Sequence, residues 1–124
     1  MRILNLTQHA STPEQGCYDL QRQDLADLKR LLTFQSLPTR QEILYRAAVI
    51  ADLADATIGD TPTMSRAAMI GGAPFLMGPL EAALKERGIT PLYAFSVRES
   101  VDEVLPDGSV RKVAVFCHKG FIEA

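Results

Sequence analysis

The sequence has no tryptophan, only two cysteines and only two histidines. Cys17 and Cys117 lie too far apart for a CxxC motif, and no cluster of histidine and cysteine has the spacing of a zinc site. A domain of this size does not need a disulfide, so we expect two buried free thiols, no metal and no other cofactor. The net charge of −2 provides no basic field for a long nucleic acid, although a small anion can still bind locally.

Long apolar runs are also missing. The opening residues 1–6 are too short for a signal peptide or a membrane span, so we expect a cytoplasmic protein without a membrane partner. The length of 124 residues predicts a single domain over residues 1–124. The apolar share of 47% and the charged share of 23% are typical of a globular protein.

Two apolar stretches, residues 4–9 (LNLTQH) and 69–74 (MIGGAP), end in small or polar residues and are each followed by a helix-start signal. This pattern is typical of two neighbouring parallel strands that end in ligand-binding loops. The hydrophobic periodicity predicts strands at 3–6, 67–70 and 91–96, helices at 21–33, 39–56 and up to residue 87, and a hairpin formed by 100–105 and 109–116. We therefore expect an α/β sandwich, with helices on both faces of central parallel strands and an antiparallel hairpin at one edge.

Ligands of open α/β sheets bind at the carboxyl ends of the strands. This rule brings together the polar residues that follow the predicted strands, which we expect to bind the ligand: Thr7, Gln8, Gly71, Gly72, Ala73, Ser96, Glu99 and Ser100. Before a helix, Gly71-Gly72 lets backbone N–H groups approach a phosphate, but a tight strand-to-helix turn needs the same residues. The segment matches neither GxGxxG nor the Walker pattern, which disfavours NAD and ATP.

Three side chains are candidates for catalysis. His9 can take a proton from a ribose 2′-OH or give one to a leaving oxygen, unless it is an ordinary loop histidine. Arg98 can bind phosphate or stabilise charge on phosphorus, and the alternative is a surface ion pair with Glu99 or Asp102. His118 lies on an alternating strand, where burial with one hydrogen bond is the competing interpretation.

Both ends of the chain resemble one known family. Residues 7–9 (TQH) and 12–15 (TPEQ), together with the runs 93–101 (YAFSVRESV), 107–110 (DGSV) and 115–121 (VFCHKGF), are similar to small CRISPR-associated ring-nuclease-like proteins and to short phage proteins. The resemblance covers about half of the chain. It implies a Rossmann-like fold of the CARF type, a cyclic oligoadenylate ligand, and a homodimer with that ligand across its two-fold axis.

By position, the resemblance assigns Gln8 and His9 to the family's first loop and Gly71-Gly72 to its phosphate loop. Ser96, Arg98 and Ser100 correspond to the end of a later strand in that family.

Three functions then compete. The first is metal-independent cleavage of a cyclic oligonucleotide by 2′-OH attack, which would damp CRISPR or related antiviral signalling. The second is a sponge or sensor that binds the nucleotide without cleaving it, and the third is a structural or interaction protein.

Overall fold

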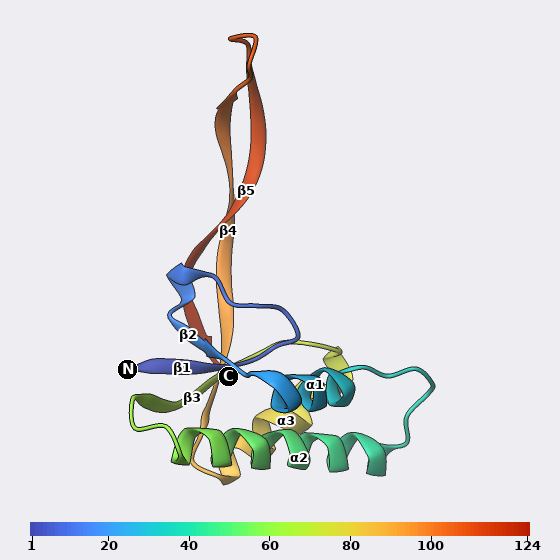
Figure 1. Cartoon of the computed structure of the whole chain (residues 1–124). Helices are drawn as coiled ribbons and strands as arrows, with labels where there is room; N and C mark the ends of the chain where they lie inside the picture. The colour runs from blue at the N-terminus through green and yellow to red at the C-terminus, as the bar shows by residue number, and fades with distance from the viewer.

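A computed structural model describes residues 1–124 as an α/β protein with a curled five-stranded sheet (Figure 1). In chain order the elements are β1 (Arg2–Leu6), the single 3-10 turn η1 (Pro13–Gln15), β2 (Cys17–Asp19), α1 (Arg22–Leu32), α2 (Arg40–Gly59), β3 (Met64–Ile70), α3 (Pro74–Glu86), β4 (Thr90–Val104) and β5 (Val110–Glu123). The strand order is β2-β1-β3-β4-β5. The first four strands are parallel and β5 is antiparallel to β4, which confirms the predicted mostly parallel sheet with a hairpin at its edge.

The helices follow the predicted pattern closely. In α1 the leucines at spacings of three and four face inward, with Leu28, Leu31 and Leu32 buried. Thr39 caps α2, because its hydroxyl oxygen accepts a hydrogen bond from the Glu42 N–H at 3.1 Å. No helix combines the length and the apolar composition that a membrane crossing requires.

All three helices pack against the same face of the sheet, which corrects the prediction of helices on both faces (Figure 1). One core joins buried side chains of α1, α2 and α3 to Leu4 and Leu6 of β1 and to Ala68 and Ile70 of β3. The physical reason is the direction of winding. The chain moves the same way along the sheet from β2 to β3 and from β3 to β4, and right-handed crossovers then put every helix on one side. Only the β1-to-β2 connection runs the other way, and it contains η1 instead of a helix.

The β4–β5 hairpin extends far beyond the rest of the sheet (Figure 1). β3 pairs with β4 only over Thr90–Leu92, whereas β5 pairs with it as far as Val104. The expectation that the strand ends at residue 96 and that Ser96, Glu99 and Ser100 follow it in a ligand-binding segment is therefore wrong about the strand end. Because an uninterrupted partner strand satisfies the backbone here, the chain stays extended, with one β-bulge between Phe95 and Ser96. We call residues 95–120 the arm.

The two cysteines are free, as expected, but both are half-buried rather than fully buried. Cys17 lies in the short edge strand β2 and Cys117 lies on the arm. Burial, followed by the charge of Asp19, raises the pKa of the Cys17 thiol.

Candidate functional site

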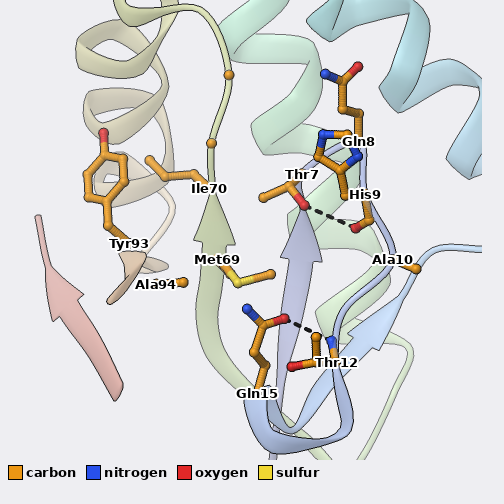
Figure 2. Close-up of a pocket in the computed structure, with 12 residues that line it drawn as sticks. Thr7, Gln8, His9, Ala10, Thr12, Gln15, Met69, Ile70, Tyr93 and Ala94 are labelled. Carbon is orange, nitrogen blue, oxygen red and sulfur yellow. Dashed lines mark hydrogen bonds between the residues drawn. The ribbon is translucent and has the colours of Figure 1, made fainter. Parts of the chain in front are cut away.

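A hollow of about 600 Å³ lies where β1 and β3 end (Figure 2). The structure thus brings together the two segments that the sequence singled out, the loop after β1 and the Gly71-Gly72 turn after β3. The lining residues are Thr7, Gln8, His9, Ala10, Thr12, Gln15, Met69, Ile70, Gly71, Gly72, Tyr93 and Ala94. His9 is the one imidazole among them, and no lysine, arginine, aspartate or glutamate lines the hollow.

The loop after β1 is held by a buried asparagine, Asn5, which is only 3% exposed. Its amide oxygen accepts hydrogen bonds from the Thr7 N–H at 2.9 Å and the Thr7 hydroxyl at 2.7 Å. Its amide nitrogen donates to the His9 carbonyl at 2.8 Å and to the Asp19 carboxylate at 2.9 Å. The Thr7 hydroxyl also lies 3.1 Å from the His9 carbonyl (Figure 2). Asn5 therefore fixes the backbone on which His9 is carried.

Asp19 connects this loop to strand β2. One carboxylate oxygen accepts from Asn5, and the other accepts from the Ser11 N–H at 3.1 Å. Burial acts to raise the pKa of Asp19, but the hydrogen bonds from Asn5 and Ser11 outweigh it and hold the pKa below its ordinary value. The loop from Thr7 to Ser11 is thus tied to the sheet at both of its ends.

The turn η1 forms another wall of the hollow. The Thr12 N–H donates to the side-chain oxygen of Gln15 at 3.0 Å, which is the interaction expected from their capping-box spacing (Figure 2). Gly16 then ends the turn with a φ of 63°. Both Thr12 and Gln15 face the hollow.

The opposite wall is built from the end of β3 and from residues near the start of β4. A side chain at Gly71 would bring its first carbon to 3.4 Å from the Thr7 methyl group, so the small residue allows the two loops to approach. Gly72 has a φ of +154°, which other residues rarely adopt. The Tyr93 hydroxyl donates to the Glu81 carboxylate of α3 at 2.6 Å. Burial, together with this carboxylate, raises the pKa of Tyr93 to about 12.

Ser96 and His118 lie at a second, smaller hollow of about 310 Å³, where they face each other across the β4–β5 ladder. Thr12 and Gln15 line both hollows, so η1 separates them. The His118 ring packs edge-on against Phe121 at 4.9 Å. Its Nδ1 atom is buried without a hydrogen-bond partner.

The remaining predicted site residues line neither hollow. Ala73 is the N-cap residue of α3, and Arg98, Glu99 and Ser100 lie on the arm. Glu99 pairs with Lys119 at 3.0 Å instead of with Arg98, and this hydrogen bond lowers the pKa of Glu99. Within one chain, the catalytic candidates His9, His118 and Arg98 therefore lie at three separate places.

Four residues that shape the site were not predicted from the sequence: Asn5, Gln15, Asp19 and Tyr93. A polar residue inside an apolar strand, as Asn5 is between Leu4 and Leu6, is a detectable signal because buried amides need partners. The spacing of Thr12 and Gln15 is that of a capping box, which gives a signal for a turn but none for a pocket wall. Asp19 and Tyr93 gave no local signal, because their roles depend on contacts with distant segments.

The chain belongs to the family described as "Uncharacterized protein MJ1673 family", whose model matches residues 1–122. No curated protein and no solved structure matches the chain.

Proposed function

Starting from membership of the MJ1673 family, we propose that the chain binds a cyclic nucleotide of the oligoadenylate type in the hollow between β1 and β3. The observation that carries the proposal is the meeting of the Thr7–His9 loop with the Gly71-Gly72 turn. The resemblance to CARF-type ring nucleases supplies the ligand class, and the sheet is proposed to be a Rossmann-like variant of that type. The proposed setting is the cytoplasm, where the protein would damp CRISPR or related antiviral signalling.

The lining suits a ligand with many hydrogen-bonding groups. Two threonine hydroxyls, a tyrosine hydroxyl, two amides, an imidazole and the backbone of two glycines line the hollow beside apolar side chains. Its volume lies within the range of about 300–1,000 Å³ that is typical of ligand pockets. A ring of four nucleotides is larger than the drug-sized ligands of such pockets. We therefore propose a homodimer in which two hollows share one ring across the two-fold axis.

Cleavage is the first candidate activity. A ribose 2′-oxygen would attack the adjacent phosphorus while the bond from phosphorus to the 5′-oxygen breaks, giving a linear product with a 2′,3′-cyclic phosphate. His9 would take the 2′-OH proton, and water would give a proton to the leaving 5′-oxygen. The glycine N–H groups would stabilise the charge on the phosphate oxygens.

Sequestration is the second candidate, and the position of Arg98 favours it. This arginine projects from the arm and does not line the hollow of its own chain. A hollow without a cation binds a nucleotide mainly through neutral donors, which holds the ligand but stabilises a pentacoordinate phosphorus less. Efficient cleavage would therefore need a second chain to bring a cation to the ligand, whereas binding alone would not.

The test is to incubate the protein with cyclic di-, tri- and tetranucleotides in EDTA while following melting temperature and reaction products. A shift with new linear products supports cleavage, and a shift with intact ligand supports sequestration. His9→Ala should then lose turnover and keep the shift, while Arg98→Ala reports whether the arm of another chain takes part. No shift with any member would contradict the nucleotide proposal and favour a structural or interaction role.

A further inference from the structure

The arm is much longer than the sheet that supports it. β4 has 15 residues and β5 has 14, whereas typical strands have about 5–6. Past Leu92, β4 has no strand neighbour except β5. Two-stranded ribbons are at best marginally stable in water, because one layer cannot bury its own side chains. A ribbon of this length therefore needs a surface to pack on.

One face of the arm is richer in apolar side chains than the other. Side chains alternate along a strand, so Phe95, Val97 and Val101 point to the same side of β4 as Tyr93, and the ladder places Val113 and Val115 of β5 beside them. We call these five residues the apolar stripe. Phe95 is 48% exposed and Val101 is 40% exposed, so the stripe faces water in the single chain. Glu99, which pairs with Lys119, lies on the same face between Val97 and Val101. Exposed apolar surface rimmed by polar residues marks interaction sites.

The charges of the arm are balanced, and most are paired within it. Glu103 pairs with Arg111 at 3.1 Å, and Glu99 pairs with Lys119 at 3.0 Å. Residues 95–120 contain four bases and four acids, so their net charge is zero: Arg98, Arg111, Lys112 and Lys119 against Glu99, Asp102, Glu103 and Asp107. A neutral, apolar ribbon offers no field for nucleic acid or for an anionic membrane. It also does not repel a copy of itself.

We propose that a second copy of this chain covers the apolar stripe, so that two arms pack together about a two-fold axis. This deepens the homodimer of the proposed function by naming its surface. In a symmetric contact the same patch serves both partners, so a second copy brings a ribbon of matching length, apolarity and neutrality. Any other partner would need to supply all three properties.

The dimensions fit such a contact. The nine ladder pairs from Ser96–His118 to Val104–Val110 make a ribbon of about 30 Å, at about 3.4 Å for each residue. That reach exceeds the radius of gyration of about 14 Å expected for a domain of this length. Each arm can therefore contact its counterpart and the partner's body, which brings the contact toward the ~800 Å² per partner of a standard interface. Of β4, the hollow uses Tyr93 and Ala94, both of which precede the arm.

The experiment is sedimentation equilibrium without nucleotide, on the wild type and two matched variants. The wild type should sediment at twice the chain mass of 13.6 kDa. Val101→Glu introduces a charge into the stripe, and because the axis brings two such charges together, the dimer dissociation constant should rise about 100-fold or more. Ala114→Glu adds the same charge to the opposite, exposed face of the arm and should leave the mass unchanged.

Three results would overturn the proposal. The wild type could sediment at the chain mass at every concentration, Val101→Glu could remain as dimeric as the wild type, or Ala114→Glu could dissociate as strongly as Val101→Glu. Far-UV circular dichroism establishes whether each variant folds. If Val101→Glu does not fold, the concentration dependence of the wild-type mass decides whether the chain forms a dimer. Because no nucleotide is present, failure of the interface and failure of the ligand proposal are separate outcomes.

Discussion

Replacing Asn5 with alanine should loosen the loop that carries His9 and lower the stability of the whole protein. The side chain makes four hydrogen bonds, to Thr7 twice, to His9 and to Asp19, from a position that is 3% exposed. Each such bond contributes about 0.5–1.5 kcal/mol net. The Thr7 hydroxyl and the His9 carbonyl lie near water, so in the variant they can form hydrogen bonds with water that recover part of the lost free energy. We therefore expect the free energy of unfolding to fall by about 2 kcal/mol.

In a chain of this length that loss corresponds to a decrease in melting temperature of about 8 °C. The assay is thermal unfolding followed by circular dichroism, with chemical denaturation as a second measure. Gln8→Ala is the matched control, because Gln8 is exposed in the same loop and makes no hydrogen bond, so its effect should stay within about 0.5 kcal/mol. If Asn5→Ala melts within about 2 °C of the wild type, Asn5 does not hold the loop as described.

Three further predictions concern neighbouring residues. Because the folded pKa of Asp19 is lowered, its contribution to stability is present above the unfolded pKa of about 3.9 and is lost as the pH falls through the folded value. The urea midpoints of Asp19→Asn and the wild type should therefore begin to approach each other below about pH 4 and meet only below the folded pKa. The pKa of Tyr93 is raised to about 12, so its contribution is complete below about pH 10 and is lost as the pH rises toward 12. Ultraviolet titration should therefore show one of the three tyrosines ionising late, and Tyr93→Phe should abolish that step. Gly72→Ala should cost about 1–3 kcal/mol in denaturation, because φ is +154° and the added carbon would lie 3.4 Å from a Met77 methyl group, and an unchanged midpoint would exclude strain at this turn.

The sequence predicted the order of helices and strands because each element carries a local signal. The leucine spacing of α1, the Thr39 cap of α2 and the turn at Asp107-Gly108 are all decided by residues close in the chain. The face of the sheet on which each helix packs is not decided by residues that are close in the chain. It depends on the strand order and on the direction of each crossover, which is why helices were expected on both faces but lie on one.

The site was predicted in part for the same reason. The loops that end β1 and β3 are adjacent because their strands pair, and the apolar runs revealed both strands. Residues 96–100 were expected to follow the predicted strand 91–96 and to line the hollow, but they continue β4, where β5 pairs with them and Arg98 lies on the arm. How far two strands remain paired depends on both sequences at once, so the reach of the hairpin was not readable from either one alone.

The most direct test of the account is a nuclear magnetic resonance titration of ¹⁵N-labelled protein with cyclic tetra-adenylate. If the ligand binds in the hollow between β1 and β3, the amide signals of Gly71 and Gly72 and those of the Thr7–His9 loop should shift most. The amides near the tip of the arm, around Gly108, should move little. Shifts confined to the arm, or no shifts at saturating ligand, would contradict the claim that these two loops form a nucleotide site.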